Sequence, residues 1–162
     1  YFTLIEKKTA VLIAAACAVG ALMAGASPDR VEALRAFGHA MGLAFQLTDD
    51  TLDYVAAEKE FGKAIGMDIR EGKITLPLIR TLARCTAGEK ETIRGIVERK
   101  QATDEDIAAV FGLIGKYDGI PYALDRARTI IADGKARLAP FRDGEAKAAL
   151  LAMADFIAER TL

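Results

Sequence analysis

The sequence predicts an all-α fold, and three observations point to it. The 162-residue chain is 52% hydrophobic but only 7% aromatic, it has no Trp, and alanine is its commonest residue. Alanine favours helices, whereas sheets favour aromatic and β-branched residues. No stretch keeps the period-two alternation of a half-buried strand. A chain of this length buries roughly two-thirds of the surface that it exposes when unfolded, which is enough for one domain.

Charge and cysteine content exclude several classes of function. The 22 Lys and Arg residues nearly balance the 23 Asp and Glu residues. The chain therefore lacks the basic excess that nucleic-acid binding requires, and no nucleic-acid partner is expected. His39 is the single histidine, and Cys17 and Cys85 lie far apart, so a Cys/His zinc cluster is excluded. Two reduced, buried thiols are typical of a cytoplasmic protein.

The N-terminal segment predicts one long helix over residues 1–26. Lys7 and Lys8 precede an uncharged run at 10–26, which is close to the minimum length for a membrane span and also resembles a signal peptide. The run is rich in Ala and Gly, so its hydrophobicity is modest. A buried core helix is therefore the preferred interpretation, and no transmembrane segment is expected.

A second long helix follows a strong stop and start signal. Ser27 is a favoured N-cap residue, Pro28 fits the first helical position, and an acidic residue follows. We expect this helix to run from about residue 28 to residue 54 or slightly beyond. Gly38 and Gly42, four residues apart, would let another helix approach it closely.

The rest of the chain predicts a loop and a series of shorter helices. Three glycines interrupt residues 58–74, which predicts a loop with broken helical turns. Thr103 and Asp106 have the spacing of a capping box, with Asp in place of Glu. The further helices are expected at about 75–86, 89–100, 103–117, 121–138 and 144–160.

An acidic stripe marks the end of the second long helix. Helical spacing places Gln46, Asp49 and Asp53 on one face, with Asp50 beside them. Asp is a poor helix former, and negative charge near a helix C-terminus opposes the helix dipole, so a counter-charge is expected. Mg²⁺ fits, because it binds one or two carboxylates together with water and phosphate oxygens. A solvated acidic helix end is the alternative interpretation.

Lysines near these acids strengthen the metal interpretation. Lys63 and Lys73 each follow a glycine in the predicted loop, and Lys8-Thr9 lies on the first helix. Lysines beside acid-bound Mg²⁺ would suit a diphosphate group. Ordinary surface charge would explain any one of these lysines alone.

On these motifs, the chain resembles the trans-type polyprenyl diphosphate synthases. The matching segments are Lys8-Thr9, F-Q-L-T-D-D-T-L-D within 37–54, and F-G-K followed by R-E-G-K-I-T-L-P within 61–77. The last segment, A-D-F-I-A-E-R at 154–160, also resembles the family's final helix. The R-E-G-K-I-T-L-P form is closest to long-chain members of the octaprenyl or decaprenyl type.

The resemblance implies the isoprenoid synthase helical bundle and a Mg²⁺-dependent prenyltransferase. Such an enzyme condenses isopentenyl diphosphate with an allylic diphosphate to give a polyprenyl diphosphate. Asp49, Asp50 and Asp53 would form the second aspartate-rich motif and bind the metal, with Asp49 as the most direct ligand. The family also implies a homodimer, and release of the product would involve peripheral contact with a membrane.

The resemblance also assigns roles to basic and polar side chains. Lys8, Lys63 and Lys73 would bind the substrate diphosphate. Thr9 and Gln46 would direct oxygen atoms towards the allylic carbocation, so Lys8, Thr9 and Gln46 are the candidate catalytic residues.

The family has a first aspartate-rich motif that these 162 residues lack, since D-D-x-x-D occurs once. We therefore expect residues 1–162 to be the C-terminal part of a single polyprenyl synthetase domain, inactive without the N-terminal part. Three other interpretations remain open from the sequence: a terpene cyclase of the same fold, a non-catalytic helical subunit of a prenyl synthase, and a helical interaction module.

Overall fold

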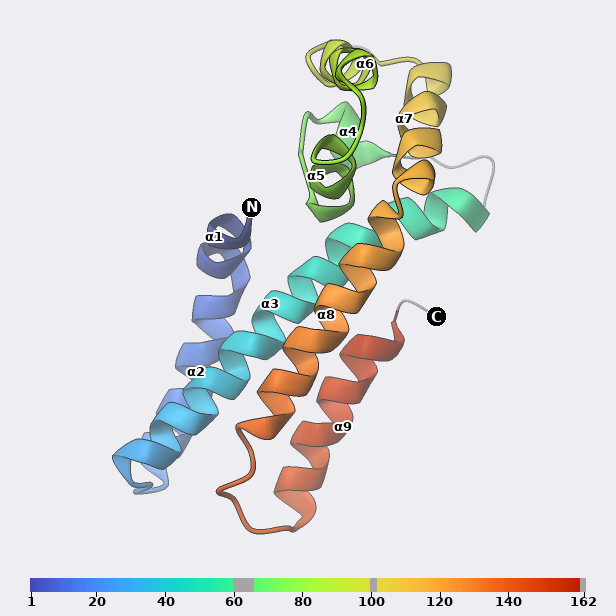
Figure 1. Ribbon diagram of the computed structural model, residues 1–162. Helices are drawn as coiled ribbons and strands as arrows, with labels where there is room; N and C mark the ends of the chain where they lie inside the picture. The colour runs from blue at the N-terminus through green and yellow to red at the C-terminus, as the bar shows by residue number, and fades with distance from the viewer. Residues whose placement is uncertain (60–65, 100–101, 161–162) are drawn as a thin grey trace. The chain divides into compact units, whose positions relative to one another are not determined.

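The computed structural model describes residues 1–59, 66–99 and 102–160, with only the backbone for 56–59. It confirms the predicted all-α class, since the described residues form helices and no strand (Figure 1). No helix among the described residues combines the length and the apolar character needed to cross a bilayer. The helices are α1 (Phe2–Ile5), the π-helix η1 (Glu6–Ala10), α2 (Val11–Met23), α3 (Pro28–Lys59), α4 (Met67–Arg70), α5 (Leu76–Leu82), α6 (Ala87–Val97), α7 (Asp104–Lys116), α8 (Gly119–Ala136) and α9 (Glu145–Glu159).

The chain divides into two compact units. Unit 1 contains residues 1–48 and 125–162, and unit 2 contains residues 49–124. The boundaries fall within α3 and α8, so each of these helices contributes to both units.

Unit 1 is a bundle in which α2, α3, α8 and α9 lie side by side (Figure 1). Lys135 of α8 reaches Asp155 of α9 at 2.7 Å, and the Arg160 guanidinium lies 5.1 Å from the centre of the Phe45 ring. The large buried side chains of this bundle are Ile5, Phe37, Met41, Leu47, Ile130, Ile131, Leu138 and Ile157.

The predicted close approach at Gly38 and Gly42 is confirmed. A Cβ atom on Gly42 would lie 2.5 Å from the Ala10 Cα atom, and one on Gly38 would lie 2.8 Å from the Ile13 carbonyl oxygen. Both distances are below 3.0 Å, which real Cβ atoms essentially never show, and both involve backbone atoms of the neighbouring helix. The two glycines are therefore needed for the packing of η1 and α2 against α3.

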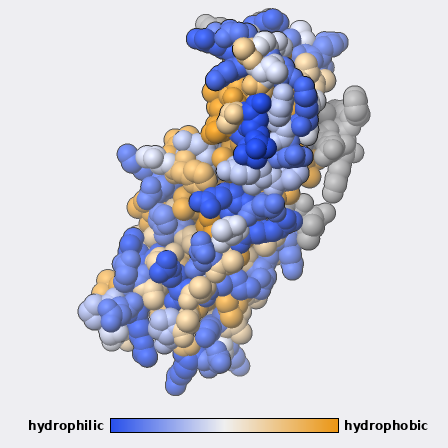
Figure 2. Space-filling model, in the orientation of Figure 1, coloured by the Kyte–Doolittle hydropathy of each residue, from blue (hydrophilic) through white to orange (hydrophobic). Residues whose placement is uncertain are grey.

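Apolar side chains also remain exposed on the first helices. The exposed fraction is 64% for Leu4, 74% for Leu12 and 83% for Met23. The face of the molecule drawn in Figure 2 is mostly hydrophilic, with apolar residues between the polar ones. Exposed apolar side chains concentrated on one segment are typical of a surface that contacts another polypeptide or a ligand.

Unit 2 has a core of its own. Its buried side chains are Tyr54, Ile69, Leu78, Ile93, Ile96, Ala102, Ile107, Val110 and Ile114. The Tyr54 ring packs against Phe111 with 5.4 Å between ring centres. This core holds the end of α3 against α4, α5, α6 and α7.

Some helix boundaries differ from the predicted ones. The first predicted helix ends at Met23 and not at residue 26, because Gly25 adopts a left-handed backbone (φ 67°) and the Ala26 amide bonds the Ala21 carbonyl oxygen. It is also not α-helical throughout, since η1 interrupts it. Helix α3 extends to Lys59, whereas its end was expected at Tyr54 or slightly beyond.

Both threonine caps are capping boxes. The prediction at Thr103 and Asp106 is confirmed. The helix predicted over 89–100 instead begins at Ala87, because Thr86 caps it and exchanges hydrogen bonds with Glu89.

Glu89 joins this cap to the end of α7. Its carboxylate accepts hydrogen bonds from Lys116 Nζ and Tyr117 Oη, each at 2.7 Å, and from the Thr86 amide at 2.8 Å. The bonds from Lys116, Tyr117 and Thr86, in that order of importance, lower the pKa of Glu89 to about 2 from an ordinary value of 4.5. The stabilisation is therefore fully present above pH 4.5 and is lost as the pH falls towards 2.

We expect Glu89→Gln to lower the melting temperature at neutral pH. The gap to the wild type should close as the pH falls from 4.5 towards 2, because the wild-type carboxylate then becomes protonated. Thermal unfolding followed by circular dichroism at several pH values measures this. Glu91→Gln, an exposed position on the same helix, is the matched control. A difference in melting temperature that stays constant with pH would contradict the stabilising role of the charged Glu89 carboxylate.

Candidate functional site

Unit 1 brings two predicted catalytic residues together. The Thr9 hydroxyl donates a hydrogen bond to the Gln46 side-chain carbonyl oxygen at 2.8 Å. Gln46 is only 5% exposed and Thr9 is half-buried, so the pair is fixed by its surroundings. Because the Thr9 hydroxyl is the donor, its oxygen still has lone pairs available, and an oxygen lone pair can stabilise a nearby positive charge.

Thr9 lies in the π-helical segment η1. Lys8 precedes it in η1 and is exposed. π-helical turns are rare within α-helices, but those that occur are often found at functional sites. Such a turn changes the direction in which the side chains around it project. Unit 1 therefore holds one basic and two polar candidates, with Thr9 and Gln46 in direct contact.

Unit 2 holds the D-D-x-x-D motif at the end of α3. Asp49 is exposed, while Asp50 and Asp53 are half-buried. Among the described residues, no group of three His, Cys, Asp or Glu side chains is arranged to hold a metal ion by itself. Three carboxylates at this spacing are still hard oxygen donors of the kind that Mg²⁺ prefers when substrate oxygens and water complete its coordination.

Asp53 is connected to Lys73 through Asp68. The Asp68 amide donates to the Asp53 carboxylate at 3.2 Å, and Lys73 Nζ bonds the Asp68 carboxylate at 2.9 Å. Lys73 also pairs with Glu71 at 2.7 Å. The bonds to Glu71 and then to Asp68 raise the pKa of Lys73, so it stays positively charged. Lys73 therefore lies beside the acidic motif, as a diphosphate ligand would need to.

Burial raises the pKa of Asp53, and the negative charge of Asp68 adds to this effect. The hydrogen bond from the Asp68 amide acts in the opposite direction and favours the charged form. The Asp53 carboxylate is thus an acid in a partly desolvated position that would gain from a nearby cation.

Tyr54 fixes the segment that follows Lys73. It is fully buried, and its hydroxyl lies 2.6 Å from the hydroxyl of Thr75, the N-cap residue of α5. Burial is the main cause that raises the pKa of Tyr54, so it remains a neutral hydrogen-bonding group. The bond ties the end of α3 to the start of α5, on either side of Lys73 in the sequence.

Sequence reasoning assigned no role to Asp68, Tyr54 or Thr75. Asp68 carries no local signal, because its contact with Asp53 goes through its own backbone amide across fifteen positions. Tyr54 directly follows the aspartate motif and Thr75 lies within R-E-G-K-I-T-L-P, so their positions near the acids and Lys73 were available as a signal. The predicted diphosphate ligand Lys63 lies outside the described residues.

Comparisons with known proteins agree on one family. The family described as Polyprenyl synthetase matches residues 1–114. A short chain isoprenyl diphosphate synthase from Methanothermobacter thermautotrophicus is 38% identical over 160 residues, which cover 99% of this chain and 49% of that protein.

Solved structures give the same result. The decaprenyl diphosphate synthase from Rhodobacter capsulatus superimposes with a TM-score of 0.93 at 33% identity. The match covers 100% of this chain and 50% of the synthase. The polyprenyl synthase from Caulobacter crescentus CB15, in complex with calcium and isoprenyl diphosphate, gives a TM-score of 0.88 at 40% identity, and this chain covers 49% of it.

The chain spans about half the length of the curated relatives that it matches. Within that half, the match to relatives and to solved structures runs essentially from end to end. The protein therefore belongs to the polyprenyl synthetase family.

Proposed function

We propose that the full-length protein is a Mg²⁺-dependent prenyltransferase that condenses isopentenyl diphosphate with an allylic diphosphate. The observation that carries the proposal is the acidic motif of α3, with Lys73 held beside it through Asp68. Residues 1–162 would be the C-terminal part of the synthase domain. That they cover about half of each relative supports the assignment as a part, and the C-terminal position is proposed from the motifs.

In unit 2, Asp49, Asp50 and Asp53 would hold Mg²⁺, with Asp49 the most accessible of the three. Lys73 would bind the diphosphate by exchanging its two carboxylate partners for phosphate oxygens, which carry more negative charge. Lys63 is proposed as a second diphosphate ligand from its motif alone.

In unit 1, Lys8 would contribute a further positive charge for the diphosphate. Thr9 and Gln46 would present oxygen atoms to positive charge that develops on the allylic carbon. Their mutual hydrogen bond supports this role, because it fixes both side chains before the substrate arrives.

The reaction breaks the allylic C–O bond, and the electron pair leaves with the diphosphate. The double bond of isopentenyl diphosphate then attacks the allylic carbon, a new C–C bond forms, and a proton is lost to the released diphosphate. When bound, Mg²⁺ neutralises the charge that grows on the leaving diphosphate. The lysines assist electrostatically, while Thr9 and Gln46 stabilise the opposite charge on carbon.

Four finer assignments are part of the proposal. The R-E-G-K-I-T-L-P form at 70–77 supports a long-chain product of the octaprenyl or decaprenyl type. A homodimer and peripheral membrane contact during product release are proposed from the family resemblance.

The fourth assignment is a cytoplasmic location. Cys17 and Cys85 are free thiols, which support this location. Both are half-buried, whereas buried thiols were expected.

The terpene cyclase, the non-catalytic subunit and the interaction module are not favoured. The relatives described above are named as synthases of isoprenyl diphosphates, and all three aspartates of the motif are present. A subunit without catalysis or an interaction module would not require them.

The test is a prenyl transfer assay on the full-length gene product. Labelled isopentenyl diphosphate is supplied with geranyl, farnesyl or geranylgeranyl diphosphate, in Mg²⁺ or in EDTA, and the products are separated by chain length. We expect polyprenyl diphosphate in Mg²⁺ only, and no product from the 162-residue chain alone. Cyclic products formed without isopentenyl diphosphate would contradict the proposal, and activity of the 162-residue chain would contradict its assignment as a part of the site.

A further inference from the structure

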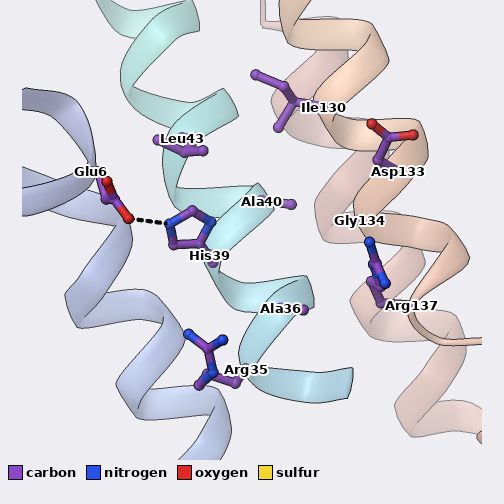
Figure 3. A pocket seen from close by; sticks show the side chains of 10 residues that line it. All are labelled: Glu6, Arg35, Ala36, His39, Ala40, Leu43, Ile130, Asp133, Gly134 and Arg137. Atoms are coloured by element: carbon purple, nitrogen blue, oxygen red, sulfur yellow. Dashed lines mark hydrogen bonds and ion pairs between the residues drawn. The ribbon is translucent and has the colours of Figure 1, made fainter. Parts of the chain in front are cut away.

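The π-helical segment η1 is fixed to α3 at two points, only one of which involves the predicted catalytic residues. At one point Thr9 bonds Gln46, as described above. At the other, the Glu6 carboxylate lies 3.1 Å from His39 Nε2, as the dashed line in Figure 3 shows. Glu6 is the first residue of η1, and Thr9 is its fourth.

The two α3 partners lie on one face of that helix. His39 and Gln46 are seven residues apart, which is close to two helical turns. Between them, Gly42 allows the Ala10 backbone to approach α3 directly. The whole of η1, from Glu6 to Ala10, is therefore held against this one stretch of α3.

The Glu6–His39 contact lies in a cavity of about 410 Å³ and is not enclosed by apolar packing. The His39 side chain is 30% exposed and that of Glu6 is 46% exposed. Both side chains are partly buried and partly exposed, so the polar contact helps to set their positions together with the packing around them. Figure 3 shows the charged side chains that share the cavity: Arg35 of α3, Asp133 of α8, and Arg137, which directly follows α8.

Arg35 has a partner on its own helix. It forms a bidentate pair with Glu32, one turn away, at 2.6 and 2.7 Å. His39 is thus the α3 side chain to which the Glu6 carboxylate is bonded. A π-helical turn is less stable than the α-helix around it, so its geometry depends on contacts of this kind.

We propose that Glu6 and His39 are positioning residues for prenyl transfer: their contact holds the π-helical geometry of η1 and thereby places Lys8 and Thr9. The inference rests on the function proposed above and extends it to two residues outside the motifs. Neither residue is assigned a contact with the substrate. Both act through the backbone of η1. That backbone places Thr9 so that its hydroxyl can bond Gln46, and this bond orients the Thr9 oxygen.

The test uses the full-length gene product and starts with the activity of the wild type. Absence of prenyl transfer by the wild type would contradict the proposed function itself. With an active wild type, we expect His39→Ala to lower kcat by about 5–20-fold and to raise the KM for the allylic diphosphate, since small displacements of a reactive geometry are costly. The KM for isopentenyl diphosphate should stay within about twofold, because Lys8 and Thr9 are assigned to the allylic substrate.

Two further variants separate positioning from simple stability. His39→Gln keeps a side-chain N–H for Glu6 and should recover most of the activity. In a Thr9→Ala background, His39→Ala should cost less than about twofold, because the residue that it positions is already lost. Arg35→Ala, in the same cavity, is the control and should leave kcat unchanged. A His39→Ala enzyme with a lower melting temperature but normal kinetics, or effects that multiply fully with Thr9→Ala, would overturn the inference.

Discussion

Asp49→Ala is expected to lower kcat of the full-length enzyme by about 10²–10³-fold while leaving the fold intact. Asp49 is the most accessible carboxylate of the D-D-x-x-D motif. If it is a metal ligand, its removal weakens the charge stabilisation of the leaving diphosphate, and loss of one such group typically has an effect of this size. Its exposed position means that no cavity is left in the core.

The measurement is steady-state kinetics at several Mg²⁺ concentrations, together with circular dichroism of the variant. Asp29→Ala is the matched control, because Asp29 is an exposed aspartate at the other end of the same helix. Its kcat should equal that of the wild type. An Asp49→Ala enzyme with normal turnover would return Asp49 to the interpretation as a solvated acid.

Gly42→Ala is the substitution with the largest expected effect on stability. The added Cβ atom would lie 2.5 Å from the Ala10 Cα atom, so the backbone of η1 must move away from α3. Overpacking of this kind costs about 1–3 kcal/mol. The better helix propensity of Ala offsets up to about 1 kcal/mol of this cost. With this offset subtracted from the overpacking cost, we expect the free energy of unfolding to fall by about 1–2 kcal/mol.

The same substitution should also reduce activity, because Ala10 follows Thr9 directly in η1. Denaturant unfolding gives the stability and the prenyl transfer assay gives kcat. Gly112→Ala is the control: Gly112 is an exposed helical glycine whose added Cβ would have no neighbour within 4 Å. Gly112→Ala should be neutral or stabilising. Equal stability of Gly42→Ala and Gly112→Ala would contradict the packing account.

Much of the fold was predictable from local signals. The Pro28 start of α3 and the capping box at Thr103 are set by residues within one helical turn. The capping box at Thr86 and Glu89 has the same kind of signal, and the prediction missed it by treating Thr86 as the end of the preceding helix. The π-helical segment η1 was not predictable, because a single π-turn barely alters the apolar pattern of a long helix.

The site was predictable in its residue types but not in its contacts. The spacing of Gln46 and the aspartates along one helix follows from the helical repeat. The partners of these residues come from distant segments: Thr9 meets Gln46 across 37 positions, and Asp68 meets Asp53 across 15. Such pairs depend on how helices pack, which local sequence does not determine.

The proposed function requires the aspartate motif to bind a diphosphate through a divalent metal. Isothermal titration calorimetry of a bisphosphonate against the full-length protein tests it most directly, in Mg²⁺ and again in EDTA, with Asp49→Ala as the comparison. We expect saturable binding in Mg²⁺, loss of binding in EDTA, and much weaker binding to Asp49→Ala. Binding of equal strength in EDTA, or no binding in either condition, would contradict it.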